Sequence, residues 1–196
     1  IRAEGNTLKL VATTLIDLQD NPQVQGTLTA TTFNGIPFYS DSSAASLYTH
    51  DVSGTDNSAE ANSAYGFNAM DSITTGDNNT AIGYRAGGAL TSGSSNVLIG
   101  KDAGDTLTTG TANVAVGVDA LQSEDDHGIN VAIGHSALET LNAGADAYNV
   151  AVGYTAGVAM TTGTNNTIMG GLAGDALTTG NNNIAMGYGA LGSEDT

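Results

Sequence analysis

The chain has 196 residues, of which 27 are Gly, two are Pro and none is Cys or Trp, and aromatic residues make up 5%. Large side chains are too scarce to fill an ordinary compact core, whereas Gly suits backbones that stack closely in a repeating array. Four basic residues against 20 acidic ones give a formal net charge of −16. This charge argues against binding to nucleic acid or to an anionic membrane, and the lack of Cys excludes disulfides and thiolate metal sites.

Residues 1–60 contain both prolines, Pro22 and Pro37, and show no regular repeat. The stretches NTLKLVATTLIDLQ and VQGTLTATTFNG alternate in the manner of short strands, with turn signals at DNP and NG. We expect residues 1–60 to form an elongated β-rich connector or shaft segment that needs other chains for stability. The first residues lack Met and a signal segment, which is typical of part of a longer protein, and no apolar run reaches transmembrane length.

Residues 61–196 repeat the motif Asn-x-x-x-Gly-x-x-Ala eight times, and we call its glycine the anchor glycine. The anchors are evenly spaced, except for one longer interval that contains an insertion in LNAGADAYN. The asparagines are Asn62, Asn79, Asn96, Asn113, Asn130, Asn149, Asn166 and Asn183. The anchors are Gly66, Gly83, Gly100, Gly117, Gly134, Gly153, Gly170 and Gly187. This regularity assigns both columns a structural role.

The residues between each Asn and its anchor predict a short strand with alternating faces. In one copy Thr80 and Ile82 share a face, and Ala81 lies on the other. Both faces are apolar in most copies, and the second face is mostly Ala. A strand that is apolar on both faces must be buried on both. We expect one face to fill a narrow coil and the Ala-lined face to pack against another copy of the chain.

The segments between strands, such as TTG and SEDDHG, predict turns in which Gly or Asn supplies positive φ. A Leu or Met follows the anchor by seven residues in one type of copy and by four in the other. The copy with Glu124 lacks an apolar residue at the seventh position, and Leu121 can compensate for it. We predict an all-β, parallel β-solenoid of about eight 17-residue coils, with the Asn column bonding backbone groups at the coil corner or its neighbours above and below.

The repeated columns resemble the head repeats of YadA-type trimeric adhesins, and units such as NTAIGYRAGGALTSG are similar to repeats in bacteriophage tail-fibre proteins. The likeness covers residues 62–191, and VQGTLTATTFNGIPF resembles connector segments of such fibres. The resemblance implies a left-handed β-roll and a fibrous homotrimer that displays a receptor-contacting surface. The adhesin head unit is usually shorter than the unit repeated in this chain, so each coil here is expected to carry an extra turn.

Few residues predict chemistry. The residues after the anchors include Tyr84, His135, Tyr154 and Tyr188, which form either a stripe for stacking sugars or edge tyrosines that pack their rings and leave their hydroxyls in water. Acidic turns lack the spacing of calcium-binding β-rolls, and His127 and His135 have Asp125 and Asp126 nearby but no recurring third ligand. We therefore expect no catalytic, cofactor or metal site, and thus no enzyme.

The sequence therefore favours the structural fibre of a phage virion, a tail fibre that contributes to host-cell attachment. The expected partners are two further copies of the chain, other virion tail proteins and a host surface glycan. A bacterial trimeric adhesin at the cell surface is the first alternative. The second is an ice-binding or other binding solenoid, because Thr75, Thr109, Thr162 and Thr179 recur in the TTG pairs.

Overall fold

A computed structural model describes residues 58–192 and, before them, six short strands. These strands are β1 (Arg2–Glu4), β2 (Thr7–Lys9), β3 (Thr32–Phe33), β4 (Ile36–Pro37), β5 (Tyr39–Asp41) and β6 (Ser46–Tyr48). The chain divides into residues 1–30, where β1 pairs antiparallel with β2, and residues 31–196, where β3 pairs antiparallel with β4. Among the described residues, no helix is long and apolar enough to cross a membrane.

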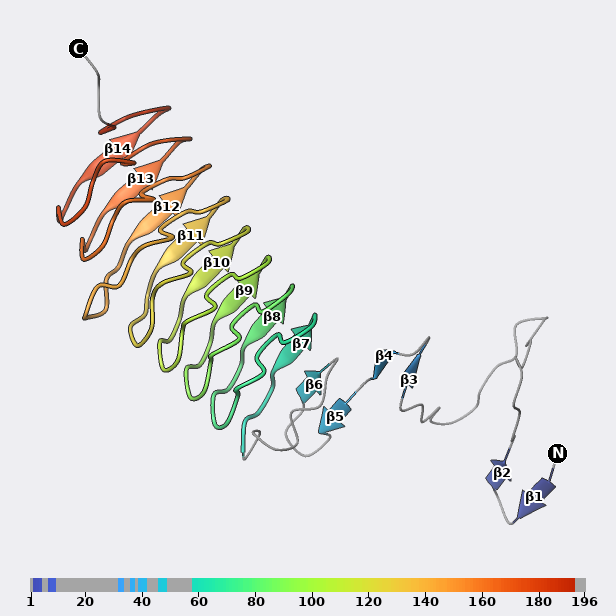
Figure 1. Cartoon of the computed structure of the whole chain (residues 1–196). Coiled ribbons are helices and arrows are strands. Elements are labelled where there is room, and N and C mark those ends of the chain that lie inside the picture. The colour runs from blue at the N-terminus through green and yellow to red at the C-terminus, as the bar shows by residue number, and fades with distance from the viewer. Residues whose placement is uncertain are drawn as a thin grey trace. The chain divides into compact units, whose positions relative to one another are not determined.

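The repeats form one parallel sheet with one strand from each copy (Figure 1). Its strands are β7 (Ser63–Tyr65), β8 (Thr80–Ile82), β9 (Val97–Ile99), β10 (Val114–Val116), β11 (Val131–Ile133), β12 (Val150–Val152), β13 (Thr167–Met169) and β14 (Ile184–Met186). Each residue pairs with the residue at the same repeat position, so Val114 lies between Val97 and Val131. The predicted parallel β-solenoid is thus confirmed, with seven complete turns between β7 and β14. Strand β6 extends the sheet parallel to β7, and β5 pairs antiparallel with β6.

The Asn column forms a continuous buried ladder that makes both kinds of predicted hydrogen bond. The Oδ1 atom of Asn96 accepts the backbone N–H of Asn113, at 2.9 Å. Its Nδ2 donates to the carbonyl of Gly110 at 2.9 Å and to Oδ1 of Asn79 at 3.0 Å. From Asn79 to Asn166, each Asn of the column bonds in this way to the coils on either side.

Two glycine columns allow the coils to approach this closely. The anchor Gly100 has φ of +136°, and a Cβ there would lie 2.2 Å from the carbonyl oxygen of Gly117. The glycine of the TTG turn is required for space rather than for its φ. Gly93 has no positive φ, but a Cβ added there would lie 2.2 Å from the carbonyl oxygen of Gly110. The prediction that this glycine supplies positive φ is therefore wrong. That conformation occurs instead two and four residues after the anchor, for example at Asp119 (+57°) and Leu121 (+51°). It also occurs directly before the ladder Asn, where Asn78, Asn165 and Asn182 (+59° each) confirm the prediction for Asn.

The prediction for the strand faces is also wrong, because the Ala-lined face is the one inside the coil. The middle residue of each strand from β7 to β14, such as Ala81, Ala115 and Ala132, is at most 3% exposed. The larger flanking residues, such as Val114 and Val116, point outward and are half-buried or exposed. The coil is so narrow that Ala fits its interior better than Val or Ile in most copies.

Volumes inside the stack are balanced between neighbouring columns. Beside the strand centre Leu98, the residues four after the anchors are Gly87 and Gly104. A Cβ added at Gly87 would lie 2.6 Å from the Leu98 side chain, and one added at Gly104 would lie 2.8 Å from it. Where the strand centre is Ala115, that position is Leu121, which is fully buried. The core therefore packs by complementary volumes rather than by identical residues in every coil.

Candidate functional surfaces

The outer strand face, defined as the outward residues of β8–β14, is a continuous and mostly apolar surface of the described chain. It consists of Thr80, Val97, Val114, Val131, Val150, Thr167 and Ile184 in one column and Ile82, Ile99, Val116, Ile133, Val152, Met169 and Met186 in the other. None of these side chains is buried within the chain, and Ile133 is 38% and Met169 41% exposed. The face follows directly from an alternation that places β-branched residues outward in most coils.

The dimensions of this face follow from strand geometry. Six intervals of about 4.8 Å between β8 and β14 give a height of roughly 29 Å, and three residues of strand give a width of about 10 Å. A projected area of about 290 Å² is comparable with the apolar patches of a few hundred Å² that mark interaction sites on soluble proteins. The face is therefore a candidate assembly surface.

A second surface, the corner ladder, consists of the residues that follow the anchors. These residues are Phe67, Tyr84, Lys101, Val118, His135, Tyr154, Gly171 and Tyr188. The rings of Phe67 and Tyr84 stack with centroids 6.2 Å apart and an interplanar angle of 7°, and those of His135 and Tyr154 lie 5.5 Å apart at 34°. Tyr154 is 61% and Tyr188 81% exposed. The predicted sugar-contact residues thus belong to two aromatic pairs and one isolated ring, with Lys101 and Val118 between the pairs.

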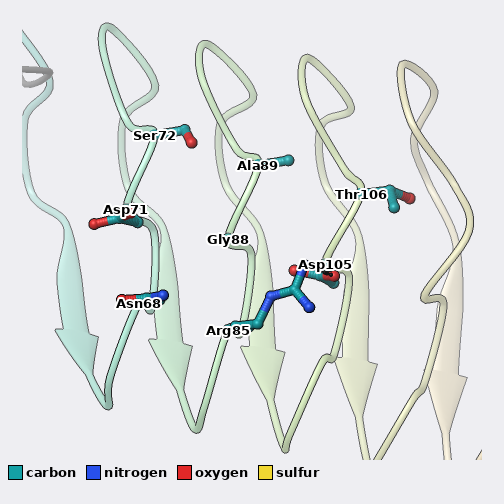
Figure 2. A pocket seen from close by; sticks show the side chains of 8 residues that line it. All are labelled: Asn68, Asp71, Ser72, Arg85, Gly88, Ala89, Asp105 and Thr106. Carbon is teal, nitrogen blue, oxygen red and sulfur yellow. Dashed lines mark ion pairs between the residues drawn. The ribbon is translucent and has the colours of Figure 1, made fainter.

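A shallow hollow of about 360 Å³ spans three coils (Figure 2), and two residues of its lining, Asn68 and Arg85, directly follow Phe67 and Tyr84 in the chain. It is lined by Asn68, Asp71, Ser72, Arg85, Gly88, Ala89, Asp105 and Thr106. An Arg85 guanidinium nitrogen lies 2.7 Å from a carboxylate oxygen of Asp105. Burial raises the pKa of the Asp105 carboxyl, and the charge of Arg85 lowers it in part. The hollow therefore offers donors and acceptors for polar ligand groups next to the Phe67–Tyr84 stack.

The threonine pairs are not a uniform exposed array. The hydroxyls of Thr74, Thr91 and Thr108 donate to carbonyl oxygens of the next coil, at 3.0 to 3.2 Å. The first Thr of these pairs therefore ties neighbouring coils together. The second column, with Thr75 and Thr109, is exposed but is interrupted by Ser92 and Ala143, and in the first column Thr161 and Thr178 are exposed as well.

The two histidines of the repeat domain belong to different surroundings. His135 lies on the corner ladder, where its Nδ1 is 2.9 Å from the Ser136 hydroxyl. His127 lies beside Glu124, with Nδ1 3.6 Å from a carboxylate oxygen. Burial raises the pKa of the Glu124 carboxyl, while the Ala143 N–H and the nearby His127 lower it in part. The side chain that lies beside His127 is therefore Glu124, and His135 lies elsewhere, on the corner ladder.

Comparison of the chain with family models, with curated proteins and with solved structures finds no match.

Proposed function

We propose that the chain is the repeat region of a homotrimeric phage tail fibre, which provides mechanical reach and contributes to host-cell attachment without catalysis. The parallel solenoid, with its unbroken Asn and Gly ladders, is suited to a stiff element that transmits force along the stack. The resemblance of its repeats to tail-fibre and trimeric-adhesin repeats supports the same function. The observation that carries the proposal is the outer strand face.

Three copies associate through this face around a common axis. The outward residues of its strands lie in straight columns, so one chain presents a flat apolar strip along its height rather than a scattered set of side chains. Burial of such a strip contributes about 25 cal/mol per Å² of apolar surface removed from water. The acidic residues remain in water, since three chains carry three times −16 charges, that is −48. This charge favours solubility and disfavours contact with acidic surfaces.

The first test is the mass of the folded protein by sedimentation equilibrium. A homotrimer has three times the mass of one 19.5 kDa chain. Val116→Lys places a charge on the outer strand face and should dissociate the assembly. Val118→Lys is the matched control, because Val118 lies on the corner ladder and is 37% exposed. A stable wild-type monomer, or equal masses for the two variants, would contradict assembly through this face.

The corner ladder is the proposed contact with a host glycan. Aromatic rings bind the apolar faces of sugars, and the hollow beside Phe67 and Tyr84 supplies partners for hydroxyl groups. An uncharged saccharide fits better than an acidic one because the chain itself is acidic. On an array of bacterial surface polysaccharides, Tyr84→Ala should lower affinity about tenfold, or roughly 1.4 kcal/mol. Tyr148→Ala, a change of an exposed tyrosine off the ladder, should leave it unchanged; equal effects would contradict this assignment.

A further inference from the structure

One coil breaks the repeat at a core position. Seven residues after the anchors, the other described coils carry Ile73, Leu90, Leu107, Leu141, Met160 and Leu177. The coil that follows Gly117 carries Glu124 instead, and its side chain is fully buried. A buried carboxylate costs free energy unless it is paired or bound to a cation. Glu124 is therefore not explained by the stacking of the coils.

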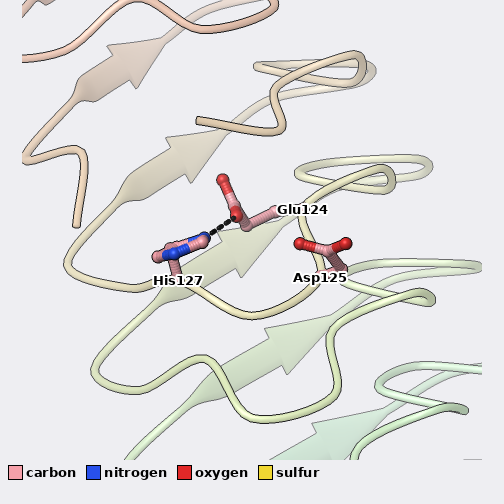
Figure 3. Close-up of side chains that lie close together, drawn as sticks. All are labelled: Glu124, Asp125 and His127. Atoms are coloured by element: carbon pink, nitrogen blue, oxygen red, sulfur yellow. Dashed lines mark ion pairs between the residues drawn. The ribbon is translucent and has the colours of Figure 1, made fainter. Parts of the chain in front are cut away.

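The same coil breaks the repeat a second time, at His127. The regular coils have Gly76, Gly93, Gly110, Gly163 or Gly180 at this position, where a Cβ in the first three would lie 2.2 Å from a carbonyl oxygen. We attribute the tolerance of a side chain at His127 to the next coil, which is two residues longer. The two substitutions meet, because Nδ1 of His127 lies 3.6 Å from Oε1 of Glu124 (Figure 3).

Neither of these facing atoms has a hydrogen-bond partner, although both are buried. The other Glu124 oxygen, Oε2, accepts the backbone N–H of Ala143 at 3.3 Å. Asp125 contributes a third group, since ligand atoms of Glu124, Asp125 and His127 all lie within 4.8 Å of one another. Figure 3 shows the Asp125 carboxylate beside the Glu124–His127 pair. An unpartnered buried oxygen and nitrogen thus point into a space that a second carboxylate borders.

The spacing of these atoms fits a metal ion better than a direct hydrogen bond. A separation of 3.6 Å exceeds the usual 2.7–3.2 Å of a nitrogen–oxygen hydrogen bond. Two ligands that bind Zn²⁺ tetrahedrally at 2.0–2.2 Å lie about 3.3–3.6 Å apart. We propose that Glu124, Asp125 and His127 form a binding site for a divalent transition-metal ion such as Zn²⁺. The combination of one imidazole with two carboxylates suits Zn²⁺ or a neighbouring transition metal, whereas Ca²⁺ and Mg²⁺ take oxygen ligands.

The acidic part of the motif that builds the site returns later in the chain. Leu121-Gln-Ser-Glu124-Asp125 corresponds to Leu191-Gly-Ser-Glu194-Asp195, and both glutamates stand seven residues after an anchor. Their anchors, Gly117 and Gly187, are separated by four coils. Glu124 is therefore not the only acidic residue that replaces the apolar residue of this repeat position. Bound metal at Glu124 would fasten the irregular turn at residues 124–127 within the stack.

The test is titration of the full chain with ZnCl₂ by calorimetry, in the presence of millimolar CaCl₂ to suppress binding to exposed carboxylates. One high-affinity Zn²⁺ site per chain is expected. Titration with CoCl₂ should give the visible absorption bands of Co²⁺ with low coordination number and at least one nitrogen ligand. Glu124→Leu and His127→Gly should each weaken Zn²⁺ binding about 100-fold or more, because loss of an outer-shell group alone costs 10–100-fold.

Both substitutions restore the residue type of the regular coils, so the variants should fold, which a thermal melt in EDTA verifies. The melting temperature should rise with Zn²⁺ for the wild type but not for these two variants. His135→Gln is the control, because it removes a histidine outside the site and should retain the binding and the melting shift. Absence of a stoichiometric site in the wild type, or equal Zn²⁺ affinity in all four proteins, would overturn the proposal.

Discussion

Replacement of Asn96 by Ala tests whether the Asn ladder holds the coils together. The Asn96 side chain is fully buried and bonds to both neighbouring coils. The substitution leaves the Asn113 N–H and the Gly110 carbonyl without the partners that they have at 2.9 Å. A buried polar group left unsatisfied costs about 1–3 kcal/mol, so two such groups should lower the free energy of unfolding by about 2–6 kcal/mol.

Two further variants sharpen this test. Asn96→Asp keeps the acceptor for Asn113 but turns a carboxylate oxygen toward the Gly110 carbonyl and Asn79 Oδ1, so it should destabilise at least as much as Ala. Asn142→Ala, which truncates an exposed side chain, is the control and should change stability by less than about 0.5 kcal/mol.

The measurements are denaturant unfolding and hydrogen exchange, because a stack of repeats can open locally without global unfolding. In the Asn96→Ala variant, the Asn113 amide should exchange faster, and amides in coils several turns away should change less. If Asn96→Ala unfolds within about 0.5 kcal/mol of the Asn142→Ala control and the Asn113 amide stays protected, the ladder does not stabilise the stack as argued.

Three other predictions follow from packing and charge. Leu98→Ala should cost about 2–5 kcal/mol in chemical denaturation, and Gly104→Leu in the same chain should recover part of that loss by recreating the Ala115–Leu121 packing; no recovery would contradict volume compensation. Gly100→Ala should cost at least about 1–3 kcal/mol from backbone strain alone, measured by thermal unfolding, and a neutral effect would refute the close approach to Gly117. The folded-state pKa of Asp105 is raised above its ordinary 3.8, so the folded state binds more protons than the unfolded state at pH values just above 3.8. The free energy of unfolding should therefore fall as pH rises through this window. Asp105→Asn should reduce this pH dependence in thermal melts recorded across pH, and an unchanged pH dependence would contradict the prediction.

The repeat columns made the solenoid and its ladders predictable from the sequence. Asn96 and Gly100 recur without exception in eight copies, and a residue that recurs in every coil must meet its own copies when the coils stack. The hydrogen bonds of Asn96 required no knowledge of the cross-section, because a polar column in a stack can bond only along the stack or to the backbone of its own coil. Properties shared by all coils are therefore visible in the sequence.

The orientation of the strands was not predictable from alternation alone, because Ala115 lies on one face and Val114 and Val116 on the other, and both faces are apolar. The deciding quantity is the space inside the coil, which depends on residues of the opposite wall. A signal for it exists in most copies: Leu98 occurs with Gly104 six residues later, and Ala115 occurs with Leu121 six residues later, whereas Ala81 with Gly87 and Ala151 with Gly157 depart from this exchange. This exchange of volume indicates that the two positions share one interior.

Positions 124 and 127 depart from the repeat, and the repeat pattern alone does not explain their side chains. A coil that needs only to stack would keep Leu at position 124 and Gly at position 127, as its neighbours do, and both exceptions cost stability by themselves through burial of a carboxylate and crowding of the next coil. The two exceptions lie against each other, because Nδ1 of His127 is 3.6 Å from a Glu124 carboxylate oxygen, and the other oxygen of Glu124 accepts the N–H of Ala143 in the longer coil that follows. Stacking alone explains neither exception, whereas the proposed cation site explains both, since ligand atoms of Glu124, Asp125 and His127 lie within 4.8 Å of one another.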